Sequence, residues 1–451
     1  MSSPKSFMSN MLCWGLVLYI LSIPVQYPAI LPFISERIKL PELIGLGLIM
    51  LFILSLLFDM KSITWKIFNL PDFFGLTLIA GSLASALLSG MSFKSFLEVA
   101  GLSYLFLIYF IVRQIVLAGN FSLIMNSYIL SATIAGFLGI AGFCLALFSF
   151  NTPLAMGLLP YPYLGNIPRA QALTTHPTML ANILIFGVIL LLGIVYDNMK
   201  IRWYQMLSVM IMLAALVLTL SKSLVNLVCA ILIMLLILYW DKIGKRILLV
   251  SSLVLLVIGF QIMTHFYFVS DFNQKNMDTL VGKNFVSGEK LFEFKNWEVY
   301  PTSYLVIKKM ELEIFRDVMI SGTGPGGYNE RVKYLQGKGV YPDNLVAFDP
   351  HSSYFGILVE QGIIGAIFLI AAMVFIVITT ANICQAALAR HKGAYAAIAS
   401  SIIIMANEAM VTDILNFRQL WVILGIAAAV WVFVKKNDSK ENFLSAKQNY
   451  Q

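Results

Sequence analysis

Long apolar blocks alternate with short polar connections along most of the 451-residue chain. Each apolar block is long enough to cross roughly 30 Å of hydrocarbon as a helix. The predicted spans lie at residues 11–33, 42–59, 72–90, 95–117, 122–150, 176–196, 203–221, 223–240, 246–268, 352–383, 394–411 and 415–434. The pattern therefore predicts an all-α polytopic membrane protein with about twelve transmembrane helices.

The composition supports the same fold class. Hydrophobic residues make up 59% of the chain and charged residues 12%, whereas a soluble domain has about a quarter charged residues. Lys and Arg gather in the connections near residues 61–66, 200–202, 242–246 and 390–392, and again after Val434. With an even number of spans these groups all lie on the side of both termini, which the positive-inside rule predicts to be the cytoplasm. Topology then explains the net charge of +8, and no nucleic-acid partner is predicted.

Two outward connections are longer than a turn, at residues 151–175 and 269–351. In the second, residues 303–320 place apolar side chains at helical spacing, which predicts an amphipathic helix along the membrane face. The glycines that follow this segment predict a tight turn. The predicted organisation is a transmembrane bundle at 1–268, a large periplasmic loop at 269–351, C-terminal membrane helices at 352–434 and a polar, disordered cytoplasmic tail at 435–451.

Some basic residues on the outward side are not explained by this topology. Arg169 precedes the start of an apolar span. There, Thr175 or His176 can cap the helix, and Pro177 suits its first turn. Lys222 lies at a tight outer turn between two spans. Helix N-termini beside basic residues favour a phosphate or pyrophosphate ligand, although both cations are also explained by snorkelling to lipid headgroups.

His351 lies at a membrane boundary, just before another apolar span. An imidazole titrates near the working pH, so it can take a proton from a sugar hydroxyl as that hydroxyl attacks. The structural alternative is an imidazole that caps the start of the helix. Glu360 and Glu408 lie inside spans, where a carboxylate needs a polar partner such as Asn or Lys. No pair of acidic residues has metal-ligand spacing, so no metal is predicted.

Three blocks of the sequence resemble the O-antigen ligase and polymerase superfamily of bacterial envelope glycosyltransferases. The first is RAQALTTHPTMLAN at 169–182, and the second is LTLSKSLVNLV at 218–228. The third combines GTGPGGY at 322–328 with HSSYFGILVEQGIIG at 351–365, and it is the most specific of the three. The blocks occur in the family's order, on either side of the large loop.

This resemblance implies a function and a location. Members of the family transfer a glycan from an undecaprenyl-diphosphate carrier to an acceptor sugar on the periplasmic face, without a metal or cofactor. The resemblance implies a protein of the bacterial inner membrane whose partners are this donor, a saccharide acceptor and membrane lipids, with a chain-length regulator protein as a further candidate. It also implies that His351 is the catalytic base and that Arg169 and Lys222 hold the diphosphate. Arg316 is a further candidate for diphosphate binding.

The chain departs from the family pattern at two cations. Lys222 stands where Arg is usual, and Lys308 or Lys309 occupies the region where an Arg opens the loop helix. Lys keeps the charge but loses the bidentate geometry of Arg.

Several functional hypotheses remain open from the sequence. A polymerase, which joins lipid-linked repeats, is favoured slightly over a ligase, which uses lipid A core as the acceptor. A transporter or flippase for a lipid-linked saccharide is the alternative from another class of protein. It would place its functional charges deep in a central cavity rather than at one face.

Overall fold

The computed structural model describes residues 4–27, 38–58, 68–161, 165–240, 242–270, 290–340, 350–389 and 392–448. Before the large connection lie α1 (Pro4–Ser22), α2 (Leu40–Phe58), the 3-10 helix η1 (Leu70–Asp72), α3 (Phe73–Leu88), α4 (Phe93–Ile115), the π-helix η2 (Val116–Asn120), α5 (Phe121–Leu147), α6 (Pro177–Asn198), α7 (Trp203–Leu218), α8 (Ser223–Leu238) and α9 (Ile243–His265). After it lie α11 (Ser303–Asp317), α12 (Tyr328–Gly337), α13 (Ser353–Ala389), α14 (Lys392–Glu408) and α15 (Arg418–Gln448). The fold is therefore mostly helical, as predicted.

Each of the twelve predicted apolar stretches overlaps one of these helices. Among the described residues, seven helical segments are long and apolar enough to cross a membrane by length and composition. One of them, Phe93–Leu147, runs through α4, η2 and α5. The segments Met8–Ser22, Trp203–Leu218 and Ser223–Leu238 are apolar but shorter. The chain therefore has the character of a membrane protein, and the number of spans stays a prediction.

Two small antiparallel sheets form in the two long connections, where the sequence analysis expected no strands. In the first connection, β1 (Ala155–Tyr161) pairs with β2 (Gly165–Ala170). The second sheet has the strand order β3-β5-β4, formed by Phe266–Ser270, Trp297–Pro301 and Phe292–Phe294. Strand β3 follows α9 directly and β5 leads into α11, so this sheet links a bundle helix to the loop helices.

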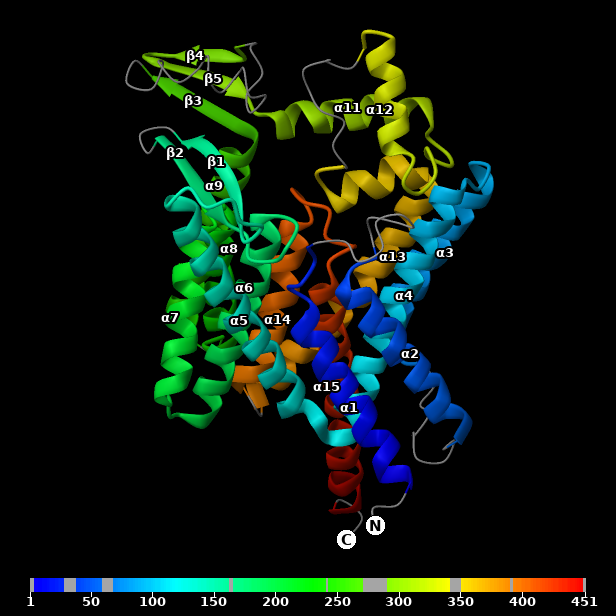
Figure 1. Cartoon of the computed structure of the whole chain (residues 1–451). Coiled ribbons are helices and arrows are strands. Elements are labelled where there is room, and N and C mark those ends of the chain that lie inside the picture. Colours follow the sequence, from blue (N-terminus) through cyan, green and yellow to red (C-terminus); the bar gives the residue numbers. More distant parts are fainter. Residues whose placement is uncertain are drawn as a thin grey trace.

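Helices α11 and α12 form a layer over one end of the bundle, together with the strands (Figure 1). Helix α11 confirms the amphipathic helix predicted at 303–320. Its buried Ile314 packs with Tyr328, Val332 and Leu335 of α12 and with Val359 of α13. This small core attaches the layer to the first part of α13.

The glycine-rich turn between α11 and α12 fits into a break in α13. Gly362 has a φ of 64° and interrupts the helix. The Ile363 N–H, which the break releases from the helix, donates to the Met319 carbonyl at 2.9 Å. A Cβ on Gly322 would lie 2.3 Å from the Glu360 carbonyl oxygen, closer than atoms can approach. These glycines therefore serve the packing of backbone against backbone.

The C-terminal helices are interleaved with the N-terminal ones. Helix α13 packs along α3, α14 contacts both α6 and α8, and α15 packs along α4. The C-terminal helices thus complete one bundle with the helices before the large connection. The domain limits predicted from the sequence stay a prediction.

A buried ion pair joins two of the elements before the large connection. It links Asp72 of η1 to Arg113 of α4, and Tyr109 Oη donates to the same carboxylate at 2.8 Å.

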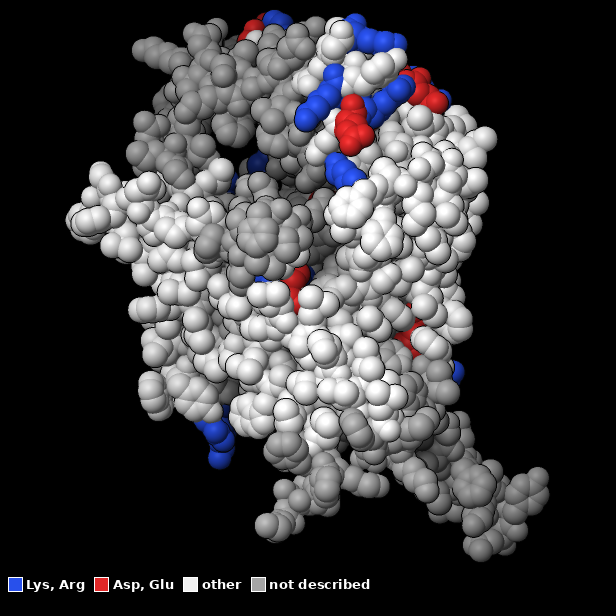
Figure 2. Space-filling view, turned by 45° about the vertical axis from the view of Figure 1, so that its right-hand side comes forward, with Lys and Arg blue, Asp and Glu red and all other residues white. Residues whose placement is uncertain are grey.

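Both chain termini lie at the end of the bundle opposite the layer of strands and loop helices (Figure 1). The flank of the bundle between these ends is a broad band with few charged atoms, as Figure 2 shows. A band of this kind suits contact with hydrocarbon. The prediction of a disordered polar tail is corrected by the structure. Helix α15 continues past Val434 and ends at Gln448. No Gly or Pro follows Val434 to stop the helix.

Candidate functional site

His351 is half-buried and lies immediately before α13. The cap of this helix is Ser352, whose Oγ accepts the Phe355 N–H at 3.4 Å. Ser353 is held by the turn before α15, because its Oγ accepts the Ile414 N–H at 2.8 Å. The neighbouring serines therefore perform the capping and anchoring that the structural alternative assigned to the imidazole.

Tyr304, at the start of α11, connects His351 to Lys222. The Tyr304 and His351 rings have centroids 5.2 Å apart at an interplanar angle of 34°. The Lys222 ammonium lies 5.8 Å from the centre of the Tyr304 ring. A cation near an aromatic face gains a modest attraction. The tyrosine therefore brings together two candidate residues that are far apart in the sequence.

Lys222 lies in the turn between α7 and α8, directly before the first residue of α8. Its Nζ donates to the Met263 carbonyl in the last turn of α9 at 2.7 Å. Although the side chain is open to solvent, desolvation by surrounding protein groups lowers the pKa of Lys222 to about 8. An ammonium has three donors, so the contact with Met263 leaves two for a ligand.

Arg169 lies on β2, beside the same turn. Its Nε donates to the Thr219 carbonyl at the end of α7, at 2.8 Å. Thr219 is three residues before Lys222, so Arg169 and Lys222 flank one short turn. The guanidinium carries further N–H groups beyond the one that Thr219 accepts. The structure thus places both predicted diphosphate ligands together.

His176 caps α6, as the sequence predicted. Its Nδ1 accepts the Thr178 N–H at 3.2 Å, with Pro177 in the first turn. Desolvation lowers the pKa of His176 to about 4, and the charges of Arg169 and His351 act in the same direction. A neutral His176 suits its role as a hydrogen-bond acceptor.

Lys308 of α11 is a third cation of this region. Its Nζ lies 2.7 Å from His265 Nε2, and His265 Nδ1 lies 2.8 Å from the Gln261 carbonyl. These contacts require a neutral imidazole that donates from Nδ1 and accepts from Nε2. The ammonium also lies 5.7 Å from the centre of the Phe355 ring on α13. Desolvation lowers the pKa of Lys308.

Glu311 is fully buried on the inner face of α11, one turn beyond Lys308. The backbone N–H of His351 lies in front of its carboxylate. Among the described residues, no side chain donates a hydrogen bond to either carboxylate oxygen. Desolvation raises the pKa of Glu311 to about 7, and the Lys308 charge acts in the opposite direction. The sequence analysis did not identify this buried acid, Glu311, as part of the site.

The two intramembrane acids have structural partners. Asn226 of α8 donates to Glu408, and Asn407 in turn donates to Asn226 at 2.9 Å. Glu360 faces the Tyr328 N–H at the start of α12 at 3.5 Å. The expected asparagine is therefore present for Glu408, whereas a backbone N–H serves Glu360.

A match to a known protein family covers this part of the chain. Residues 207–370 match the O-antigen ligase family. This match supports the resemblance to the O-antigen ligase and polymerase superfamily, and it implies a glycosyl-transfer enzyme that acts on lipid-linked glycans. No curated protein matches the chain.

The matched O-antigen ligase segment contains Lys222, Tyr304, Lys308, Glu311 and His351. Arg169 lies outside it and reaches the cluster through the β hairpin. The space-filling view shows a hollow beneath the loop layer in which Lys or Arg atoms are visible (Figure 2). We call these five residues and Arg169 the outer cluster.

Arg316 is not brought into the outer cluster. It lies in the last turn of α11, exposed to solvent, and pairs with Glu313 at 2.9 Å. Twelve residues separate it from Tyr304, which is roughly 18 Å along a helix. Lys308, eight residues earlier on α11, lies in the cluster, whereas the predicted diphosphate ligand Arg316 does not. A polar residue on the buried stripe of an amphipathic helix, such as Glu311 between Ile307 and Ile314, was the signal available in the sequence.

Proposed function

We propose that this protein transfers a glycan from an undecaprenyl-diphosphate carrier to an acceptor sugar on the periplasmic face of the bacterial inner membrane. The observation that supports the proposal most directly is the convergence of His351, Tyr304 and Lys222 within the segment similar to O-antigen ligases. These residues come from three separate stretches of that segment. A base next to a cation suits a reaction in which a hydroxyl attacks and a phosphate departs.

The proposed step begins with the acceptor hydroxyl. His351 takes the hydroxyl proton while the oxygen forms a bond to the anomeric carbon of the donor sugar. The bond from that carbon to the diphosphate oxygen breaks, and its electron pair leaves with the diphosphate. Arg169, Lys222 and Lys308 offset the charge that develops on the leaving group.

The rings around the base help to hold it in place. Tyr304 restricts the imidazole from one side at a centroid distance of 5.2 Å, and Ser352 and Ser353 fix the backbone that follows it. A base whose position is fixed before the substrate binds loses less entropy in the transition state. The proposed reaction therefore uses a site that is largely formed in advance.

Polymerase activity is the proposed form of the reaction, in which the acceptor is a second lipid-linked repeat. Ligase activity, with lipid A core as the acceptor, is the alternative within the same chemistry. Both use the outer cluster in the same way, because they share the donor. The acceptor therefore has to be distinguished by experiment.

The test uses the purified full chain, an undecaprenyl-diphosphate-linked oligosaccharide and a metal chelator. A ladder of products on a gel indicates polymerisation, and a single shifted band with added lipid A core indicates ligation. His351→Gln, which keeps a side chain of similar size, should lower the rate by about 10²- to 10⁴-fold. Its apparent thermal midpoint should equal that of the wild type.

Two results would overturn this proposal. A fully active His351→Gln protein would remove the base from the mechanism. Movement of the labelled lipid-linked donor across a vesicle membrane, without any new glycosidic bond, would instead favour a flippase.

A further inference from the structure

A second recess lies at the end of the bundle that carries the chain termini, away from the outer cluster. It has a volume of about 670 Å³ and lies among α5, α6, α7, α14 and α15. Pockets that hold small molecules have volumes of about 300 to 1,000 Å³. The proposed transfer reaction does not use this recess, which we call the inner recess.

The polar side of the inner recess carries two cations, Lys200 and Arg202, from the turn between α6 and α7. Arg202 Nη1 donates to the Tyr204 hydroxyl at 2.9 Å. Within the described part of the chain, Lys200 makes no hydrogen bond or ion pair. Neither cation is therefore neutralised by a described acid.

The one acid in the lining, Asp197, is already occupied. Its two carboxylate oxygens accept the N–H groups of Gly393 and Ala394 at 2.7 and 3.0 Å. These contacts hold the start of α14 against the end of α6. Asp197 keeps its negative charge, so Lys200, Arg202 and this acid together leave the lining with a net positive charge for a ligand.

The other side of the recess is apolar. Phe121 and Met125 of α5, Ile194 of α6 and Phe433 of α15 line it. A ligand that fits this lining needs an anionic group and a hydrocarbon portion. Basic pockets between membrane helices recognise anionic lipid headgroups in this way.

We propose that the inner recess binds an anionic phospholipid, with its phosphate on Lys200 and Arg202 and an acyl chain against the apolar wall. This site is separate from the proposed transfer reaction, and its occupancy does not depend on that function. Orientation alone explains why basic residues lie at this end. It does not explain why two of them line a recess with an apolar wall.

The test measures binding of phosphatidylglycerol and of phosphatidylcholine with matched acyl chains to the full chain in neutral detergent. Native mass spectrometry and the shift in thermal midpoint give two independent readouts. Each cation near a lipid surface is expected to contribute about fivefold in affinity. Lys200→Gln with Arg202→Gln should therefore weaken phosphatidylglycerol binding by on the order of 30-fold and leave phosphatidylcholine binding unchanged.

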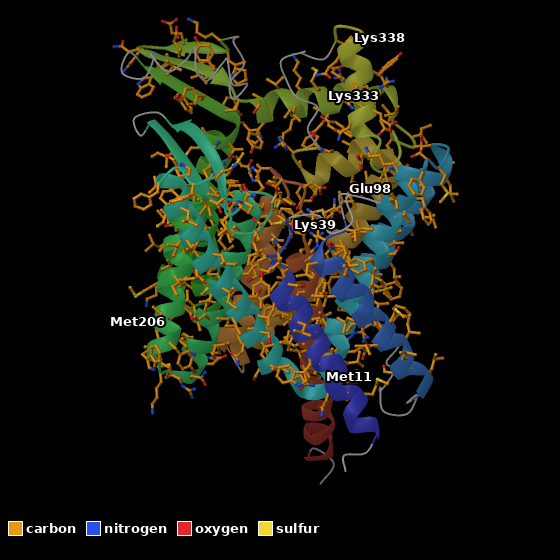
Figure 3. The ribbon with its side chains drawn as sticks, viewed as in Figure 1. Met11, Lys39, Glu98, Met206, Lys333 and Lys338 are labelled. Atoms are coloured by element: carbon orange, nitrogen blue, oxygen red, sulfur yellow. The ribbon has the colours of Figure 1, made fainter. Side chains whose placement is uncertain are left out.

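Two variants serve as controls. Lys333→Gln with Lys338→Gln removes one cation from α12 and one from the residue directly after it, at the other end of the molecule, where Figure 3 shows both side chains. This α12 variant should not change binding. Lys200→Arg with Arg202→Lys keeps both charges in the recess and should retain phosphatidylglycerol.

Three outcomes would overturn the proposal. Equal binding of the two lipids would show that the recess does not select an anion. Equal losses in the recess variant and the α12 variant would mean that net charge alone attracts the lipid. Competition by glycerol 3-phosphate at a similar concentration to phosphatidylglycerol would identify a site for a soluble anion.

Discussion

Two groups of charged residues in the described part of the chain, each with a buried acid, are built in opposite ways. Asp72, the last residue of η1, accepts hydrogen bonds from the Arg113 guanidinium, the Tyr109 hydroxyl and the Asn69 backbone N–H. Glu311, in the outer cluster, has among the described residues a backbone N–H in front of it and Lys308 acting through space. Both carboxylates are fully buried.

The difference distinguishes a group that stabilises the fold, around Asp72, from a group whose charges can bind a ligand, the outer cluster. In the first group the acid and the base neutralise each other, so no charge is left to attract a substrate. In the outer cluster, Lys222 and Arg169 donate to backbone carbonyls and Lys308 contacts a neutral imidazole. These contacts leave the side chains charged, so an anion that enters the cluster would be attracted to them.

The largest effect on stability is expected from breaking the buried ion pair between Asp72 and Arg113. Arg113→Ala leaves Asp72 buried without its counter-charge, which typically costs about 3 to 5 kcal/mol. Lys308→Ala removes a cation whose closest described contact is a neutral imidazole, so its thermal midpoint should fall much less. Thermal unfolding of both variants in the same detergent measures the contrast. Equal losses would mean that the outer cluster is also held together by its charges.

Glu311 should destabilise the fold in a pH-dependent way. Its pKa rises from 4.5 to about 7 on folding, so the folded state binds more protons than the unfolded state between these values. The cost of the charged form is absent below pH 4.5, grows as the pH rises, and is complete above about 7. It reaches at most roughly 3 kcal/mol.

Glu311→Gln should therefore raise the thermal midpoint at about pH 8 and leave it nearly unchanged at about pH 4.5. Glu313→Gln, on the exposed side of the same helix, is the matched control. A gain that does not depend on pH would mean that the carboxyl does not titrate in this range.

The smallest effect is expected for Lys222, on the pH dependence of donor binding. It tests the proposed role of this residue directly. Its pKa of about 8 means that the ammonium loses its proton as the pH rises through this value. The KM for the lipid-linked donor should then rise by up to about tenfold above pH 8. Lys222→Arg stays charged, so its KM should remain flat. Arg316→Ala, which breaks an exposed pair with Glu313, should change the KM by less than about twofold.

The same alkaline rise in the wild type and in Lys222→Arg would assign the titration to another group. Lys308, whose pKa is also lowered, would be the next group to test by the same substitution to Arg.

The sequence was sufficient for the features that depend on local order. Apolar blocks of membrane length predicted helices at all twelve positions, and helical spacing located α11. His176 and Pro177 predicted the start of α6, because a cap and the residue after it are neighbours in the chain. The short strands in the long connections were missed, because each depends on pairing with a partner strand.

Only the tertiary structure decided which ionisable residues come together. A helical pattern assigns Tyr304, Lys308 and Arg316 to the same helix, but it does not say which end of that helix meets His351. The contact between Lys308 and His265 joins residues 43 positions apart, and the partner of Glu408 lies 182 positions away. Such contacts depend on how helix faces pack, so the sequence determined the helices and packing determined the outer cluster and the inner recess.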